Sequence, residues 1–269
     1  MTRTDEGTRA AIVTGGGTGL GRATVTALAA SGVDCVVAGR RADPLDEVVE
    51  HLADHPGRVV AVAEADVADE ADRQRIVTTC LDEFGRVDIL VNNAGTSHQA
   101  PLLDFSLEDW REVMACNLDA PFFLSQLVLE DMRKRSWGRI VNIASVYGSL
   151  GFNASLYGDL RPDTSPGDRG PVRAPAYHVS KGGLLNLTRE LAIAVAPWGV
   201  TVNTVSPGMV PLPTSNLDDE AARRLQDMTP LKRFGTPPEI GAVVRFLASE
   251  ESSFMTGADV VVDGGWSIW

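Results

Sequence analysis

Short apolar runs alternate along the chain with longer segments in which apolar side chains recur at the spacing of a helix. This alternation is typical of a parallel β-sheet with helices on both of its faces. Since crossovers between parallel strands are nearly always right-handed, the predicted fold class is α/β, a doubly wound and mostly seven-stranded parallel sheet. Ligands of such a sheet bind at the carboxyl ends of its strands, so functional residues are expected just after strands. The seven expected strands are residues 10–13, 33–38, 59–62, 89–91, 139–143, 200–205 and 260–262.

The composition is typical of a globular domain without a large polyanionic partner. The 269 residues are 44% hydrophobic, enough for one large core, and we expect a single domain over residues 1–269. The 24 basic and 36 acidic residues give 24 − 36 = −12, which argues against nucleic acid or an anionic membrane as the main partner. Any anionic ligand must therefore be held by local groups.

Cysteine and histidine usage indicates neither a disulfide framework nor a metal site. Cys35, Cys80 and Cys116 are odd in number and far apart, and the four histidines lack metal-ligand spacing.

The first seven residues carry charge where a signal peptide needs an apolar core, and no apolar run of about 18 residues occurs. We therefore expect a soluble cytoplasmic protein without a metal or a membrane span.

A glycine-rich loop follows the first expected strand and opens a helix. It reads Thr14-Gly15-Gly16-Gly17-Thr18-Gly19-Leu20-Gly21-Arg22. Glycines let the chain turn sharply and let backbone N–H groups approach a pyrophosphate. A plain tight turn is the alternative, but the position between strand and helix favours a dinucleotide site. The expected contacts are Gly15, Thr18, Gly19, Leu20 and Gly21.

The end of the second strand bears on the choice of cofactor. A dinucleotide fold that takes NAD offers an acid to the ribose hydroxyls about 20 residues past the loop, but Gly39 stands there, 39 − 21 = 18 residues past Gly21. Arg40 and Arg41 follow, and their guanidinium groups would attract a 2′-phosphate. Two arginines after a strand are also compatible with a solvated loop. The absence of an acidic residue at Gly39 is therefore the stronger evidence against NAD(H). NADP(H) is the preferred cofactor, with NAD(H) as the alternative.

The third and fourth strands lead to further cofactor candidates. Asp66 is placed to accept a hydrogen bond from an adenine amino group, although Asp66 or Asp69 is equally suited to cap a helix that begins near Glu70. The segment after the fourth strand would carry small residues and amides past the sugar. The remaining candidates in these two loops are Val67, Asn93, Ala94 and Gly95.

Tyr177 and Lys181 lie four residues apart, just before a helix-like run over residues 182–191. On a helix such residues share a face, so both side chains can point into one cleft. A phenol has a reference pKa of about 10, and a neighbouring ammonium is expected to lower it by favouring the phenolate. Tyr177 is therefore a candidate general acid/base, although such a pair taken alone is more often a surface pair.

Six motifs follow one another along the chain: Thr14-Gly15-x-x-x-Gly19-x-Gly21, Asn92-Asn93-Ala94-Gly95, Ser145, Tyr177-x-x-x-Lys181, Ser206-Pro207-Gly208 and Asp263-Gly264-Gly265. In order and approximate spacing they resemble the short-chain dehydrogenase/reductase family, from about Arg9 to the C-terminus. The resemblance implies a single-domain Rossmann-like enzyme, usually a homotetramer, that moves a hydride between NAD(P) and a carbonyl or alcohol carbon.

The resemblance also implies roles for individual residues. Ser145 would hydrogen-bond the substrate oxygen, and Tyr177 would give that oxygen a proton during reduction. Lys181 would hold the nicotinamide ribose and lower the tyrosine pKa, and Asn117 would keep a water-linked proton path to the lysine. The loop after the sixth strand would meet the nicotinamide amide; its candidates are Pro207, Gly208 and Val210.

The chain departs from the family pattern between the serine and the tyrosine. The two are 177 − 145 = 32 positions apart, against about a dozen in family members, so an insertion over residues 152–174 is expected as a surface loop near the active site. Tyr157 stands at the usual distance, but Arg161 replaces the lysine and Pro162 disfavours a helix there, so Tyr177 is preferred. The insertion is either a lid that narrows substrate choice or a tolerated surface loop.

Two other segments carry expectations about substrate and assembly. Residues 211–230 are expected to cover the substrate, although many family members have a threonine where Leu212 stands, and Thr214 is the candidate replacement. Trp266, Ile268 and Trp269 are expected to be buried against a partner subunit in a homotetramer or homodimer.

The predicted function is NADP(H)-dependent hydride transfer to or from a ketone or secondary alcohol. The candidate substrate classes are those of a ketoreductase of specialised metabolism, a 3-oxoacyl reductase, or a sugar or polyol dehydrogenase. The alternative is a catalytically silent cofactor-binding protein of regulatory or structural role, which predicts loss of the tyrosine or lysine, whereas both are present.

Overall fold

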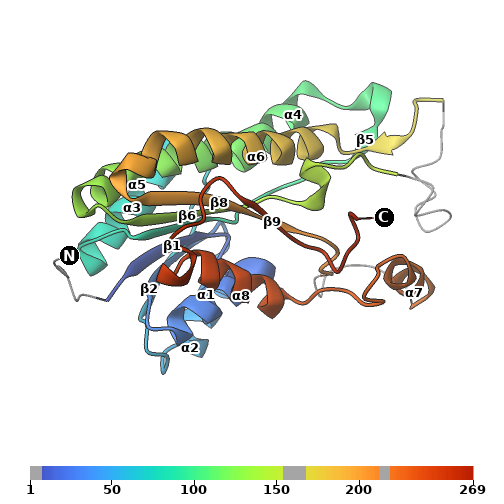
Figure 1. Cartoon of the computed structure of the whole chain (residues 1–269). Coiled ribbons are helices and arrows are strands. Elements are labelled where there is room, and N and C mark those ends of the chain that lie inside the picture. Colours follow the sequence, from blue (N-terminus) through green and yellow to red (C-terminus); the bar gives the residue numbers. More distant parts are fainter. Residues whose placement is uncertain (1–7, 154–167, 212–218, 269) are drawn as a thin grey trace.

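The computed structural model describes residues 8–153, 168–211 and 219–268. Its centre is one sheet of seven parallel strands in the order β3-β2-β1-β4-β6-β8-β9 (Figure 1). The seven strands predicted from the apolar runs are confirmed, and their bounds agree within two residues. The strands are β1 (Ala10–Thr14), β2 (Asp34–Ala38), β3 (Val59–Val62), β4 (Ile89–Asn92), β6 (Gly138–Ile143), β8 (Val200–Pro207) and β9 (Asp259–Val262).

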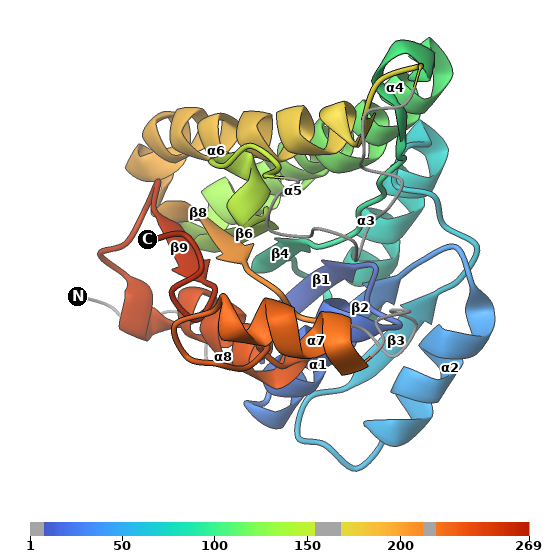
Figure 2. The same cartoon turned by 90° about the vertical axis from the view of Figure 1, so that its right-hand side faces the viewer.

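Helices cover both faces of this sheet, as expected for a doubly wound fold. In Figures 1 and 2, α1, α2 and α8 lie against one face and α3, α5 and α6 against the other, whereas α4 and α7 stand at the carboxyl-terminal side of the strands. The helices are α1 (Gly19–Ala30), α2 (Ala42–His51), α3 (Glu70–Phe84), α4 (Leu107–Met114), α5 (Ala120–Arg135), α6 (Pro175–Val195), α7 (Asp219–Asp227) and α8 (Pro237–Leu247).

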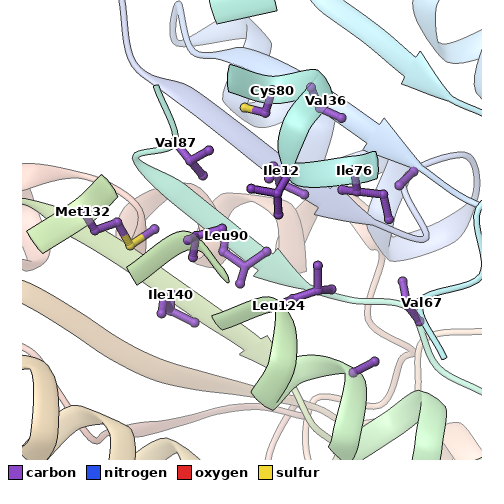
Figure 3. Packing of buried hydrophobic residues seen from close by; sticks show 14 of the residues in the cluster. Ile12, Val36, Val67, Ile76, Cys80, Val87, Leu90, Leu124, Met132 and Ile140 are labelled. Carbon is purple, nitrogen blue, oxygen red and sulfur yellow. The ribbon is translucent and has the colours of Figure 1, made fainter. Parts of the chain in front are cut away.

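The central strands are rich in apolar residues because both of their faces are buried. In β1, Ile12 packs into the layer formed with α3, α5 and α6, while the next residue, Val13, packs into the layer formed with α1, α2 and α8. Figure 3 shows the first layer, where Ile12 and Leu90 from the sheet meet Leu124 from α5. Each layer is a closed hydrophobic core, so the sheet edge at the carboxyl ends is held rigidly.

A second, two-stranded antiparallel sheet was not predicted. It joins β5 (Ala100–Pro101) to β7 (Val172–Arg173), with Ala100 opposite Arg173. Two residues per strand give no periodic signal, so sequence patterns cannot reveal this pairing. Because β7 belongs to the predicted insertion, the end of the insertion that precedes α6 is attached to the loop after β4.

The order of the strands creates a crevice at their carboxyl ends. From β1 the chain continues to β2 and β3 on one side, and then crosses to β4 and β6 on the other. Such a reversal is the usual binding site of a doubly wound sheet, because the two adjacent loops diverge there. No helix in the described residues is long and apolar enough to cross a membrane.

Candidate active site

The glycine-rich loop between β1 and α1 brings backbone to the crevice. Gly15 has φ +63°, and a Cβ there would lie 2.9 Å from Asn93 Nδ2. A Cβ on Gly21 would lie 2.1 Å from Gly15 O, so a side chain at either position would push the loop out of place. Thr18 is the N-cap of α1, but its side chain does not cap the helix. The N–H groups of the first turn are therefore free to bind an anion such as a diphosphate.

The loop borders a cleft of about 350 Å³ at the β1–β4 crossover. The predicted residue Asn93 does not line the cleft but supports the glycine-rich loop. Its Nδ2 donates to Thr14 O at 2.8 Å and to Gly15 O at 3.1 Å. The lining residues that sequence reasoning missed include Thr96, Glu112 and Cys116, which come from loops and helices without a motif of their own. Gly19, Leu20 and Gly21 do not line the cleft. The predicted residues that line it are Gly15, Thr18, Arg40, Arg41, Asp66, Val67, Ala94 and Gly95.

The far end of this cleft is positively charged at its rim. Arg40 and Arg41 are exposed, and within the described ranges no carboxylate pairs with either guanidinium. Gly39 lies between them and β2 and also lines the cleft, so no acidic side chain stands where a 2′-phosphate would sit. An anionic group on the ribose would therefore meet two guanidinium groups, those of Arg40 and Arg41, and no nearby carboxylate from the loop after β2.

The two aspartates after β3 have different positions. Asp69 is the N-cap of α3, which begins at Glu70, and its side chain accepts from Asp72 N at 3.0 Å. Asp66 lines the cleft, and its Oδ1 accepts from Ala68 N at 2.9 Å. The helix cap is thus Asp69, and Asp66 is the carboxylate that the loop after β3 contributes to the cleft wall.

The loop after β8 packs against the turn after β9. Gly208 N donates to Val262 O at 3.0 Å, and a Cβ on Gly208 would lie 2.6 Å from that of Asp263. Pro207 ends β8, and Val210 packs beside Gly235. These residues sit at the carboxyl edge of the sheet but do not line the cleft. Leu212 and Thr214 lie outside the described residues.

Tyr177 and Ser145 face each other across the same edge. Tyr177 stands in the first turn of α6, and Ser145 follows β6 as the N-cap of the short 3₁₀ turn η3 (Val146–Gly148). Ser145 Oγ accepts from Tyr147 N at 3.2 Å and lies close enough to the Tyr177 side chain to lower the pKa of its hydroxyl. The fold therefore brings Ser145, which follows β6, next to Tyr177 on α6. Tyr157, Arg161 and Pro162 lie outside the described residues.

The expected effect of Lys181 on the Tyr177 pKa is not found in this structure. Lys181 shares the face of Tyr177 on α6, with Nζ 5.8 Å from the tyrosine ring centroid, but it donates to Ile143 O at 2.6 Å. Burial raises the pKa of Tyr177 above its usual 10, and the hydrogen bond with Ser145 only partly opposes this. Burial also lowers the pKa of Lys181 to about 8. The lysine charge is directed at a carbonyl and not at the phenol.

Asn117 is held in a distorted helical turn. A single π-helical turn, η2 (Ala115–Asp119), joins α4 to α5, and such turns often mark functional sites. Its Oδ1 accepts from Thr96 N at 2.8 Å, and Nδ2 donates to Thr96 O at 2.9 Å and to Ser180 Oγ at 3.1 Å. A Cβ on Gly95 would lie 3.3 Å from Asn117 Oδ1 and 3.6 Å from Lys181 Nζ. Asn117 thus ties the end of the cleft to the helix that carries Tyr177 and Lys181.

One cavity adjoins the Tyr177 side chain and a second lies next to it, and the walls of both were largely missed by sequence reasoning. The smaller, of about 130 Å³, is lined by residues from the β4 loop, from η3 and from the described end of the insertion. The larger, of about 470 Å³, shares Tyr147 with it and reaches Asp227, Met228 and Trp266. No motif marks these residues, because they meet only in the folded chain. The smaller cavity is lined by Ser97, Gln99, Tyr147, Phe152, Val172, Arg173, Ala174, Tyr177 and His178.

The C-terminal part of the chain packs over this region. Within the predicted covering segment 211–230, α7 buries Leu225 against Val146 and Trp266. Trp266 is therefore buried within its own chain, which corrects the expectation of burial against a partner. Ile268 is 81% exposed, and Trp269 lies outside the described residues.

The cleft and the small cavity are connected through the residues around α6. Tyr177 lines the cavity, and Asn117 links α6, through Ser180, to Thr96 on the wall of the cleft. The fit to a dinucleotide rests on the glycine positions, where any Cβ would collide, and on the uncapped start of α1. Such a site suits hydride transfer, in which the oxygen of a reduced carbonyl needs a proton donor.

Comparisons with known proteins agree with this description. The family model described as short chain dehydrogenase matches residues 9–158, and the one described as enoyl-(acyl carrier protein) reductase matches residues 166–267. A 3-oxoacyl-[acyl-carrier-protein] reductase from Synechocystis is 36% identical, with 95% of each chain covered. A D-beta-hydroxybutyrate dehydrogenase from Rhizobium meliloti is 31% identical, with 97% of this chain and 99% of the relative covered.

A solved structure has the same fold. The crystal structure of a putative short-chain alcohol dehydrogenase from Sinorhizobium meliloti matches with a TM-score of 0.85 and 31% identity over 97% of both chains. Sequence motifs, sheet order and relatives therefore agree, and the chain belongs to the short-chain dehydrogenase/reductase family.

Proposed function

We propose that this oxidoreductase transfers a hydride between NADP(H) and the carbon of a ketone or secondary alcohol, with Tyr177 as general acid/base. The family assignment gives an NAD(P)(H)-dependent enzyme that acts on CH–OH groups. The observation that carries the proposal is the position of Tyr177 in the wall of a small cavity, beside Ser145 and one helical turn from Lys181. A bound nicotinamide would supply or accept the hydride, and the residues of the chain handle the proton.

The proposed proton path runs from Tyr177 to the substrate oxygen. Ser145 would hydrogen-bond that oxygen, so that negative charge developing on it during reduction meets two donors. Burial raises the pKa of Tyr177 and so favours the protonated phenol, which is the form that a proton donor requires. Lys181 would bind the ribose hydroxyls, a role that requires its ammonium to leave Ile143 O or to share it. Asn117 would position Lys181 through the turn at Thr96 and Ser180.

NADP(H) is the preferred cofactor in this proposal. Support comes from Arg40 and Arg41, which lack carboxylate partners in the described parts of the chain, and from Gly39 at the position of an acid. A carboxylate at that place would repel a 2′-phosphate and bind the free ribose hydroxyls of NAD. Asp66 remains available for the adenine side of the cleft.

Three substrate classes remain candidates. They are a ketone of specialised metabolism, a 3-oxoacyl thioester, and a sugar or polyol. The relatives named above reduce 3-oxoacyl groups or oxidise a hydroxy acid, which supports a keto group close to a second carbonyl. We also propose that residues 152–174 narrow the choice of substrate, because the described end of this insertion lines the cavity beside Tyr177.

The alternative is a catalytically silent protein that binds NADP without turnover. The assay that decides is NADPH oxidation by the purified enzyme with a panel of ketones from the three classes, followed by the same panel with NADH. We expect turnover of at least one ketone and a higher kcat/KM with NADPH. No oxidation with any ketone, and no reduction of NADP by the corresponding alcohols, would favour the silent protein. Equal or higher kcat/KM with NADH would contradict the proposed cofactor preference.

We also propose that residues 1–269 form one domain that assembles as a homotetramer or homodimer. Large apolar side chains are exposed on several parts of the surface, which is uncommon in a monomer. Sedimentation velocity would test this, and a single monomeric species at micromolar concentration would contradict it. The most exposed of these side chains are Leu103 and Leu107 near α4, Ile193 on α6, and Phe254 and Ile268 near the C-terminus.

A further inference from the structure

The cavity beside Tyr177 contains an arginine that the proton chemistry does not use. Arg173 lies in β7, four residues before Tyr177, and is half-buried in the wall of the smaller cavity. Its strand partner Ala100 directly follows Gln99, which lines the same cavity. The two-stranded sheet therefore holds the Arg173 backbone at a defined place beside the reacting phenol.

The guanidinium of Arg173 is largely unsatisfied. Nη1 donates to Val172 O at 2.8 Å, and the guanidinium carbon lies 5.5 Å from the centre of the Phe152 ring. A guanidinium has five N–H donors in one plane, so most of them are left for another acceptor. Across the described ranges, no carboxylate lies within ion-pair distance of Arg173. Partial burial removes water from this group, and an anionic ligand would restore its lost interactions.

The charge of the cavity is opposite to that of the whole chain. The protein carries 36 acidic and 24 basic residues, yet none of the described residues that line this cavity is acidic. Arg173 is therefore its only permanent charge among them, and no acidic neighbour in the wall competes for it.

Arg169, a second arginine of the same insertion, forms an ion pair and serves as a comparison for Arg173. Arg169 Nε donates to Asp104 Oδ1 at 2.9 Å, and both side chains are largely exposed. This pair attaches the insertion to the turn after β5. Arg169 thus has the partner that Arg173 lacks, and it lies outside the cavity wall.

We propose that Arg173 binds a carboxylate of the substrate, so that the enzyme acts on small oxo acids and the corresponding hydroxy acids. The inference rests on the proposed function and names its substrate class. In reduction, the carbonyl carbon accepts the hydride and its oxygen accepts the proton from Tyr177. The carboxylate keeps its atoms and its charge, and serves only to orient the substrate against Arg173. Planar guanidinium and carboxylate groups can form two parallel hydrogen bonds, which fixes orientation as well as affinity.

The experiment compares acids with their uncharged isosteres. The NADPH-dependent reduction of 2-oxobutanoate, 3-oxobutanoate and 4-oxopentanoate is measured beside that of the three corresponding primary amides. The wild type is expected to favour at least one acid over its amide by tenfold or more in kcat/KM. Arg173→Gln should lower kcat/KM for that acid by about 10- to 100-fold, mainly through KM, because a charge-assisted hydrogen bond is lost. The amide should be reduced as before, and Arg173→Lys should recover part of the acid activity.

Arg169→Gln is the matched control, because it removes an arginine from the same insertion outside the cavity. It should leave the preference for the acid unchanged. The proposal is overturned if the wild type does not distinguish any acid from its amide, or if Arg173→Gln lowers acid and amide activity equally.

A binding measurement separates this proposal from the proposed function. If no compound is reduced, the proposed reductase function fails, and the melting temperature with NADPH and each oxo acid then tests Arg173 alone. Stabilisation of the wild type and of Arg169→Gln, but not of Arg173→Gln, supports an anion site. Equal shifts in all three proteins overturn it.

Discussion

Replacing Lys181 by methionine measures the free-energy cost of its buried charge. Lys181 is 5% exposed, and burial lowers its pKa from 10.5 to about 8. A tenfold change in proton affinity is worth about 1.4 kcal/mol. The difference of 10.5 − 8 = 2.5 therefore corresponds to about 3 kcal/mol, by which protonated Lys181 reduces the free energy of unfolding below pH 8.

The sign of the pH dependence follows from where the protons bind. Between pH 8 and 10.5 the unfolded chain holds a proton on Lys181 that the folded chain has released, so the stability of the wild type rises with pH in this window. Methionine removes this titration and also the hydrogen bond to Ile143 O, a loss of about 1 kcal/mol at every pH. The stability of the wild type relative to Lys181→Met should therefore increase by about 2 to 3 kcal/mol from pH 7 to pH 10.

The assay is urea unfolding followed by tryptophan fluorescence at pH 7, 8, 9 and 10, with the protein concentration held constant. Lys134→Met is the matched control, because Lys134 is an exposed lysine on α5 that pairs with Glu130. Its stability difference from the wild type should stay nearly constant over the same range. A constant or decreasing difference for Lys181→Met would refute the argument that burial lowers this pKa.

Three further variants test the cleft and its supports. Arg40→Ala combined with Arg41→Ala should raise KM for NADPH by about 10- to 100-fold and leave KM for NADH unchanged, because charge-assisted contacts to the 2′-phosphate are lost. Equal changes of KM for both cofactors in steady-state kinetics would contradict this. Gly21→Ala places a Cβ 2.1 Å from Gly15 O and should cost about 1 to 3 kcal/mol of stability in urea unfolding, together with loss of dinucleotide binding in a fluorescence titration. Asn117→Ala leaves the N–H and C=O of Thr96 unpaired and should lower both kcat and melting temperature; an unchanged kcat would remove Asn117 from the proton path.

The main sheet could be predicted because its strands are buried on both faces. Continuous apolar runs such as residues 10–13 of β1 indicate this burial, and the helices between the strands leave only a doubly wound arrangement. The β5–β7 pairing could not be predicted, since its two short strands are 70 residues apart and are joined through the insertion. Its position nevertheless decides where Arg173 lies.

The arrangement of the proposed proton-transfer residues could be predicted in part. The four-residue spacing of Tyr177 and Lys181 sufficed to place them on one helical face, and the motif order pointed to Ser145. Spacing along a helix does not reveal which carbonyl comes within reach, so the contact of Lys181 with Ile143 and the raised pKa of Tyr177 could not be anticipated. The walls of the cavity were missed for the same reason, because Tyr147 and Arg173 meet only after folding.

The central claim is that the Tyr177 hydroxyl donates the proton in carbonyl reduction. Its most direct test is kcat/KM of Tyr177→Phe for the best ketone with NADPH, beside Tyr147→Phe, which removes a hydroxyl from the same cavity. NADPH affinity, measured by fluorescence titration, verifies that the cleft of each variant is intact. We expect Tyr177→Phe to lose about 100- to 10,000-fold in kcat/KM, the usual contribution of a general acid, and Tyr147→Phe to lose far less. Full activity of Tyr177→Phe, or an equal loss in both variants, would contradict the account.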